Sequence, residues 1–122
     1  MSYIDGFVIP VPTEKKQAYL DLAAQAAPFF MKYGATRIVE CWGDDVPDGK
    51  VTDFKGAVKA EPGETVVFSW IEWPSKEVRD EAKRRMMEDP DMKPPENMPF
   101  DGKRLIVAGF APLFDTSGEM TR

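Results

Sequence analysis

Histidine is missing from the sequence, and cysteine occurs once, at Cys41. The absence of histidine removes the side chain best suited to proton transfer near neutral pH, and it excludes Ser-His-Asp and Cys-His catalysis within one chain. It also excludes histidine-ligated zinc, iron or haem, while a single thiol cannot build a thiolate zinc or iron–sulfur site. Any catalysis must rely on carboxylates, Lys, Arg, Tyr, Cys or a bound cofactor, and the residues themselves predict no metal and no cofactor.

Long apolar runs are missing as well. No stretch of about 20 apolar residues is available to span a membrane, and the first residues, MSYID, lack the basic and apolar regions of a secretory signal. Cys41 has no second cysteine in the chain with which to form a disulfide. We therefore expect a cytoplasmic protein that makes no contact with a membrane.

Basic residues are outnumbered, because 16 Lys and Arg stand against 21 Asp and Glu, for a formal net charge of −5. Most nucleic-acid affinity comes from Lys and Arg that neutralise phosphates, which makes an acidic protein a poor candidate. One basic cluster, Lys83-Arg84-Arg85, lies in an otherwise acidic helical segment. We expect no nucleic-acid partner.

The chain of 122 residues, 43% hydrophobic and 30% charged, has the length and composition of one globular domain. The patterns of apolar residues predict strands at 3–11, 36–42, 65–73 and 104–113, and helices between Thr13 and Gly34 and between Ser75 and Asp89. A short helical turn is expected after Asp53, and a frayed tail from Asp115. The order β-α-β-β-α-β predicts an α+β fold of the ferredoxin-like type, with a four-stranded antiparallel sheet and both helices on one face.

The ends of the first helix carry signals of their own. Thr13 is the expected N-cap, and Gly34 is the expected stop at the C-terminal end. Pro28 lies inside the helix and removes one backbone hydrogen bond, so that a kink or a break is expected there.

The second helix should begin after Ser75 as N-cap and bury a narrow stripe of Val78, Ala82 and Met86. Its acidic and basic residues lie four apart in two pairs, Asp80–Arg84 and Glu81–Arg85. Each such pair stabilises a helix by about 0.2–0.5 kcal/mol.

Both faces of the predicted sheet are apolar. On the third strand, Val66, Phe68 and Trp70 alternate with Val67, Ile71 and Trp73. Two helices cannot cover both faces, and each large side chain left in water forfeits about 1.5–3 kcal/mol. A patch of this size marks an interface, and a second copy of the chain covers it with two-fold symmetry. We therefore predict a homodimer; the alternative is that one of the two alternating sets of side chains is simply less buried than the pattern indicates.

Four segments of the sequence form a recognisable set: DGFV at 5–8, ECWGDDVPDGK at 40–50, VFSWI at 67–71 and MPFDGKR at 98–104. Together they resemble the YbaA-like family of small bacterial proteins of unknown function. The resemblance covers nearly the whole chain, and the segments GDDVPDGK and MPFDGKR are quite specific to it.

Membership of that family implies the dimeric α+β barrel architecture, in which two ferredoxin-like sheets face each other. Relatives of this architecture include cofactor-free monooxygenases, isomerases, haem-handling enzymes and proteins with no known activity. The family supplies no catalytic residues to carry over, and kinship of fold does not fix chemistry.

Charged residues within the apolar strands are the best candidates for a site. Buried charges are costly unless they are paired, and a carboxylate whose pKa is raised by an apolar cavity can act as general acid or base. We therefore name Asp5, Glu40 and Glu72 as catalytic candidates, with Arg37 and Trp70 as binding candidates. The alternative is that these residues lie at strand ends or form structural pairs across the dimer.

Two loops supply further candidates. Asp101 and Lys103 can present an acid and a cation to a small anionic ligand, or they can belong to a tight turn that leads into an edge strand. The acidic loop contains Asp44, Asp45 and Asp48, whose oxygens suit magnesium or calcium. It lacks the spacing of a calcium loop, and turn chemistry is the alternative for these residues.

The remaining aromatic and sulfur residues are open to two interpretations. Trp42, Trp70 and Trp73 with Phe7 either belong to the core or line a pocket for a planar ligand. Cys41 has no cationic neighbour in the sequence and is interpreted as an inert thiol rather than a nucleophile.

Two hypotheses for function follow. The first is a homodimeric small-molecule-binding protein with its pocket between sheet and helices, which extends to a cofactor-free enzyme acting on a small organic substrate. The second is a non-enzymatic stress-related or protein-interaction module whose dimer surface or acidic loop binds another protein. A Glu40→Gln substitution separates them, because it should abolish ligand binding under the first hypothesis and leave partner binding intact under the second.

Overall fold

The computed structural model describes residues 2–117. Its elements run β1 (Tyr3–Pro12), a 3-10 turn η1 (Thr13–Lys15), α1 (Lys16–Lys32), β2 (Arg37–Trp42), α2 (Phe54–Ala57), β3 (Glu64–Trp73), α3 (Lys76–Glu88) and β4 (Ile106–Phe110). The four strands form one antiparallel sheet in the order β2-β3-β1-β4. This element order and strand order define a ferredoxin-like α+β fold, which confirms the predicted fold class.

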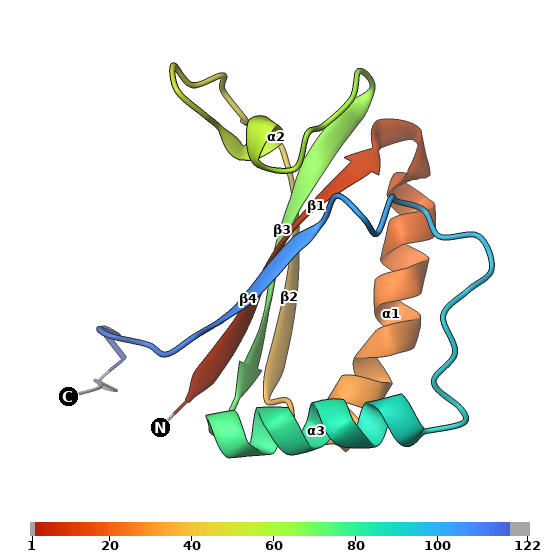
Figure 1. Ribbon diagram of the computed structural model, residues 1–122, viewed down its shortest axis with the longest axis vertical. Coiled ribbons are helices and arrows are strands. Elements are labelled where there is room, and N and C mark those ends of the chain that lie inside the picture. Colours follow the sequence, from red (N-terminus) through yellow and green to blue (C-terminus); the bar gives the residue numbers. More distant parts are fainter. Residues whose placement is uncertain (1, 118–122) are drawn as a thin grey trace.

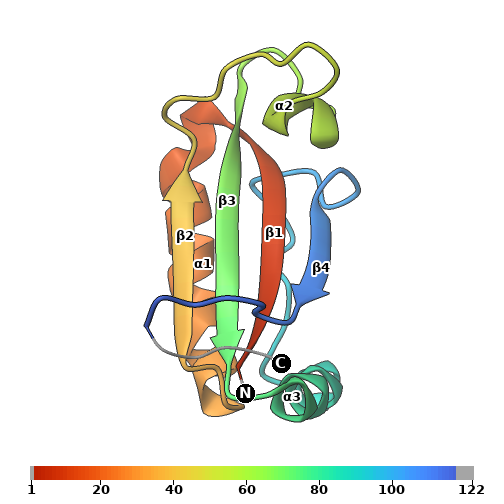
Figure 2. The ribbon, with the colours of Figure 1, turned by 90° about the vertical axis from the view of Figure 1, so that its left-hand side faces the viewer.

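The two faces of the sheet differ in how they are covered. Figure 1 shows α1 lying along one face of the sheet. In the same view α3 lies across the end of the molecule at which β1 begins. The opposite face, which we call the open face, is turned toward the viewer in Figure 2 and carries no helix over its middle. The short α2 covers one end of it, where Phe54 packs edge-on against Phe68 with ring centroids 6.0 Å apart, and the segment after β4 passes in front of it. The predicted uncovered apolar face is therefore present.

The core lies between the sheet and α1 and α3. One buried cluster joins Ile9, Val11, Tyr19 and Val67. A second joins Ala35, Ile71, Trp73 and Ala82, with Phe30 edge-on to the Trp73 indole. The strand residues among them lie at odd-numbered positions of β1 and β3, because strand alternation sends successive side chains to opposite faces. Trp73 is thus a core residue. Among residues 2–117, no helix is long and apolar enough to cross a membrane.

The first helix differs from its prediction at its start. Thr13 does not cap it: α1 begins after Lys15 without a side-chain cap, and the Thr13 hydroxyl donates instead to the Gly63 carbonyl, 3.1 Å away. Pro28 does not break the helix, which continues to Lys32. Gly34, with φ of +118°, ends it as expected, because a residue with a Cβ rarely adopts this conformation.

The start and buried stripe of α3 follow the sequence pattern. The Ser75 hydroxyl accepts a hydrogen bond from the Val78 amide at 3.2 Å, which is the predicted N-cap. Ala82 and Met86 are buried, as expected for the apolar stripe.

The ion pairs on α3 are only partly as expected. Glu81 and Arg85 form the predicted pair at 3.0 Å. The predicted pair of Asp80 with Arg84 is wrong, because Arg84 pairs with Glu81 and Glu88 instead. All of these side chains are exposed, so small differences in solvation decide which partner is chosen.

The last strand is shorter than predicted. It covers Ile106–Phe110, whereas the sequence pattern extended it from Arg104 to Leu113. At its start Arg104 is held in a turn by Asp101, and after its end Pro112 has no N–H to offer the sheet. The tail expected from Asp115 is described only to residue 117, where the Asp115 carboxylate accepts hydrogen bonds from the Ser117 amide and hydroxyl; residues 118–122 lie outside the described residues.

Candidate functional site

Tyr19 and Glu40 form the polar centre of the space between α1 and the sheet. Tyr19 is the buried residue of α1. Glu40 lies on β2 opposite Ser69 of β3, on the face that the helix covers. The Tyr19 hydroxyl donates to Oε1 of Glu40 at 2.6 Å, and the Ser69 side chain is a second hydrogen-bond partner of the same carboxylate.

The surroundings of this pair change the acidity of both groups. Glu40 as a whole residue is exposed, but its carboxyl group lies against α1, where partial burial raises its pKa above the ordinary value of 4.5, although the hydrogen bonds from Tyr19 and Ser69 oppose the rise. Burial also raises the pKa of Tyr19, and the hydrogen bond to Glu40 adds to the effect. Tyr19 therefore remains a donor, while Glu40 is a stronger base than an ordinary carboxylate. Such a carboxylate can exchange a proton with a bound molecule.

Two hollows meet at this pair. An inner cavity of about 120 Å³ lies under α1, and Phe7, Phe30 and Ile71 form part of its apolar wall. An outer pocket of about 380 Å³ opens between α1 and β2. Tyr19 and Glu40 line both, so a molecule in the outer pocket meets the carboxylate at the entrance to the inner cavity.

The outer pocket is mostly apolar apart from this pair, Gln17 and the cation of Lys16. Leu20, Trp42 and Val67 supply apolar wall. Lys16 of α1 places its ammonium 5.5 Å from the centroid of the Trp42 ring, close enough for a cation–π contact. The pocket therefore combines a basic carboxylate, a phenol donor, an aromatic wall and one positive charge.

A separate hollow, of about 590 Å³, lies on the open face and has no charged side chain in its lining. Its lining includes Phe68, Ile106 and Phe110, which are 46%, 46% and 56% exposed. Gly6 forms part of it, and a Cβ at that position would lie 3.2 Å from the Phe110 ring. The missing side chain of Gly6 thus leaves room for the ring of Phe110.

Three of the predicted candidates come together at the edge of the open face. Nη1 of Arg37 lies 3.5 Å from Oε2 of Glu72, and the Trp70 indole N–H donates to the same oxygen at 2.9 Å. Arg37 and Glu72 face each other on paired strands, and Trp70 precedes Glu72 by two residues on the same face. Glu40 lies on the opposite face, so the structure does not bring it together with this group.

Asp5 occupies a third location, in the buried layer under α3. Its carboxylate accepts a hydrogen bond from the Trp73 indole at 3.0 Å and pairs with the Arg79 guanidinium, also at 3.0 Å. Arg79 lies over the Tyr3 ring and donates to the Tyr3 hydroxyl. Asp5 is therefore fully engaged within its own chain and lines none of the hollows around Glu40.

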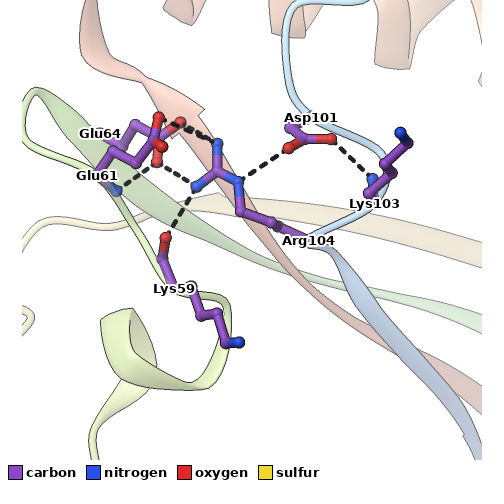
Figure 3. Close-up of polar contacts among 6 residues, drawn as sticks. All are labelled: Lys59, Glu61, Glu64, Asp101, Lys103 and Arg104. Carbon is purple, nitrogen blue, oxygen red and sulfur yellow. Dashed lines mark hydrogen bonds and ion pairs between the residues drawn. The ribbon is translucent and has the colours of Figure 1, made fainter.

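Asp101 and Lys103 lie in the turn before β4 (Figure 3). The Asp101 carboxylate accepts from the Lys103 amide at 2.9 Å and from Nε of Arg104 at 3.0 Å. Arg104 in turn forms a two-pronged pair with Glu64, at 2.7 and 2.8 Å, and donates to the Lys59 carbonyl. This arrangement fastens the turn to the start of β3, and it lies apart from both Glu40 and the Arg37 group.

The acidic loop and the thiol are exposed. Asp44, Asp45 and Asp48 lie in the exposed segment between β2 and α2. Within residues 2–117, no three Asp, Glu or Cys side chains are grouped so that they could hold a metal ion. Cys41 is exposed and faces the open side, because it pairs with Phe68 across β2 and β3.

Sequence reasoning named Glu40 but missed its partners. The sequence pattern does not single out Tyr19, Ser69 or Lys16 as candidates for a site. One signal was available for Tyr19: a buried tyrosine needs a hydrogen-bond partner for its hydroxyl, and Glu40 is a charged residue within an otherwise apolar strand.

The comparisons with known proteins bear on the family. The model of the family "Protein of unknown function (DUF1428)" matches residues 2–102. The chain is 65% identical over 116 residues to the uncharacterized protein YbaA of Escherichia coli strain K12, a match that covers 94% of this chain and 99% of that protein. YbaA of Shigella flexneri matches with the same identity and coverage.

Two solved structures are similar at low sequence identity. The structure of Rv0793 from Mycobacterium tuberculosis has 15% identity and a TM-score of 0.45, over 95% of this chain and 99% of that chain. The de novo designed protein Foldit4 has 15% identity and a TM-score of 0.43, over 91% of this chain and 98% of that chain.

Proposed function

We propose that this chain, which belongs to the DUF1428 family of proteins of unknown function, binds a small, mostly apolar organic molecule that carries a hydroxyl or another acidic proton. The binding site in this proposal is the pocket of about 380 Å³ between α1 and β2. The observation that carries the proposal is the hydrogen bond of 2.6 Å from Tyr19 to Glu40 at the base of that pocket.

The chemistry of the lining supports this ligand class. An ionised carboxylate only accepts hydrogen bonds, so Glu40 calls for a ligand that donates one. Leu20, Trp42 and Val67 favour a ligand with an apolar body. The ammonium of Lys16 beside Trp42 can form an ion pair with a negatively charged group of the ligand.

The same pair suits proton transfer without a cofactor. Glu40 takes the acidic proton as the ligand's C–H or O–H bond breaks, and the electron pair of that bond stays on the ligand as an enolate or phenolate. Return of the proton to a different atom of the ligand completes an isomerisation, which needs no oxidant and no second substrate. Tyr19 keeps its proton and holds the Glu40 carboxylate in place.

The proposed functional unit is a homodimer joined through the open face. Phe68, Ile106 and Phe110 are about half exposed there, and each loses on the order of 1 kcal/mol by remaining in water. Two copies that pack through this face remove these side chains, together with the half-buried Ile4 and Trp70, from water, which favours association.

Sedimentation equilibrium tests the dimer. The wild-type protein should sediment as a dimer at micromolar concentration, and Phe68→Asp should sediment as a monomer because it places a charge in the interface. Met87→Asp is the matched control, since Met87 is exposed on α3, away from the open face. A wild-type monomer at micromolar concentration would contradict the dimer.

Binding is tested with 4-nitrophenol, whose phenolate absorbs visible light while the phenol does not. The wild type should bind it saturably, and Glu40→Gln should weaken binding about 10- to 100-fold, because a hydrogen bond to a charged group contributes about 1.5–3 kcal/mol. Glu72→Gln is the control, since Glu72 lies on the open face and should leave the dissociation constant unchanged. Equal affinity of Glu40→Gln and wild type would overturn the proposed site.

A further inference from the structure

We infer that residues 111–114, which we call the arm, pack against the sheet of the second copy in the homodimer. The inference rests on the proposed dimer, and it adds that each copy contributes a segment to its partner's surface. The arm has the sequence Ala-Pro-Leu-Phe and follows directly after β4.

The arm is apolar and exposed. Leu113 is 81% exposed and Phe114 is 71% exposed, more than the large apolar side chains of the open face itself. Figure 1 shows the chain leaving the end of β4 on the open side of the sheet and running away from it. In Figure 2 the same segment passes in front of the open face. The arm, with its two exposed apolar residues, therefore lies on the side of the sheet that a second copy would occupy.

Local structure explains why the arm leaves its own sheet. Phe110, the last residue of β4, pairs with Ile4 of β1, and β1 begins at Tyr3. Residues after Phe110 therefore have almost no further residues of β1 with which to pair. Pro112 has no N–H for a further ladder hydrogen bond. Beyond the arm, Asp115 accepts hydrogen bonds from the Ser117 amide and hydroxyl, which forms a polar turn. The arm is thus an apolar segment between the end of a strand and a polar turn.

The length of the arm matches the distance it has to cross. Sheets that pack face to face lie about 10 Å apart. Four extended residues span about 13 Å, at about 3.3 Å per residue. An arm that leaves one sheet on its open side can therefore reach the layer of the other sheet and cover apolar surface there. Two-fold symmetry then places the arm of the second copy against the sheet of the first in the same way.

A cross-linking experiment distinguishes the partner's sheet from the arm's own sheet. A photoreactive benzoylphenylalanine replaces Leu113, and copies labelled with ¹⁴N and ¹⁵N are mixed, allowed to exchange, and irradiated. Cross-linked peptides that combine one light and one heavy chain are expected to make up about half of the products. Products that join only light to light and heavy to heavy, or the absence of cross-links to sheet residues, would overturn the inference.

A paired substitution gives an independent measure. Leu113→Asp combined with Phe114→Asp should raise the dimer dissociation constant at least tenfold in sedimentation experiments, whereas Met87→Asp should leave it unchanged. An unchanged constant in the paired variant would contradict the arm contact while leaving the dimer intact. A wild-type protein that sediments as a monomer would instead contradict the dimer itself, so the two failures are distinguishable.

Discussion

Arg79 of α3 reaches Asp5 of β1 across 74 positions of the sequence, and its guanidinium lies 3.0 Å from the carboxylate. Both side chains are nearly buried. The Trp73 indole also donates to Asp5, and Arg79 also donates to the Tyr3 hydroxyl and pairs with Asp80 at 2.8 Å. This pair fastens α3 to the sheet. It explains a charged residue in an apolar strand without any appeal to a ligand, unlike Glu40, whose partners lie beside an open pocket.

Removal of one partner of the Asp5–Arg79 pair should destabilise the fold strongly. Arg79→Met leaves the Asp5 carboxylate buried without its cation, so we expect a loss of about 3 kcal/mol in the free energy of unfolding, measured by urea denaturation. Adding Asp5→Asn to Arg79→Met should recover part of the loss, because the uncompensated charge is removed. Arg84→Met on the same helix is the control and should leave the denaturation midpoint unchanged, since its ion pairs are exposed. Equal effects of the two Met substitutions would contradict a buried structural pair.

Stability should depend on pH through Glu40. Its pKa is raised in the folded state by burial, so the folded protein binds the proton more tightly than the unfolded chain does. The resulting contribution of Glu40 to the free energy of unfolding is fully present below pH 4.5, the ordinary pKa of the group. It is lost as the pH rises through the pKa that Glu40 has in the folded protein. Glu40→Gln should therefore flatten this part of the curve of melting temperature against pH. A curve that Glu40→Gln leaves unchanged above pH 4.5 would show that Glu40 has an ordinary pKa.

Tyr19→Phe should raise the pKa of Glu40 further, because the hydrogen bond from Tyr19 opposes the effect of burial. It should also lower the free energy of unfolding by about 1–2 kcal/mol, since the carboxylate loses a donor in a partly buried site. The pKa is read from the side-chain carboxyl ¹³C signal of Glu40, assigned through its loss in Glu40→Gln. Ser69→Ala is expected to shift the pKa in the same direction. A fall of the pKa in Tyr19→Phe would contradict the assigned hydrogen bond.

The Arg104 cluster should protect the fold against acid. The hydrogen bonds from Arg104 lower the pKa of Glu64, so this contribution to stability is present above the ordinary value of 4.5 and is lost as the pH falls through the lowered one. Arg104→Lys cannot keep the two-pronged geometry and should lower the melting temperature at neutral pH by several degrees. Glu61→Gln is the control, because Glu61 is exposed and 3.7 Å from the guanidinium. A melting temperature that responds equally to both changes would contradict a specific role for Glu64.

Spacing of apolar residues was enough to predict the fold and the uncovered face. The four strands, the two long helices and the Ser75 cap follow from local patterns that the tertiary structure does not overrule. Thr13 failed as a cap because it lies inside the 3-10 turn η1 that precedes α1, while its hydroxyl donates to the Gly63 carbonyl, 50 residues away. Arg79 could not be recognised as the partner of Asp5, because an arginine on a charged helix carries no local sign of a contact with a distant strand.

The grouping of the site residues was within reach of the sequence. Alternation along β2 sends Arg37 and Glu40 to opposite faces, because they are three residues apart. Trp70 and Glu72 share a face because they are two apart. The charged residues of the strands therefore cannot form one site, because the alternation places Glu40 on one face of the sheet and Arg37 with Glu72 on the other. The register of β2 against β3, which pairs Arg37 with Glu72 and Glu40 with Ser69, required the structure.

The most direct test of the account is the location of bound 4-nitrophenol in ¹H–¹⁵N correlation spectra of labelled protein. The pocket between α1 and β2 predicts that the amides of Tyr19, Leu20, Glu40 and Trp42 shift in a saturable manner, and that these shifts are lost in Glu40→Gln. Shifts confined to Gly6, Phe68 and Ala108 would place the molecule in the hollow of the open face and contradict the proposed site.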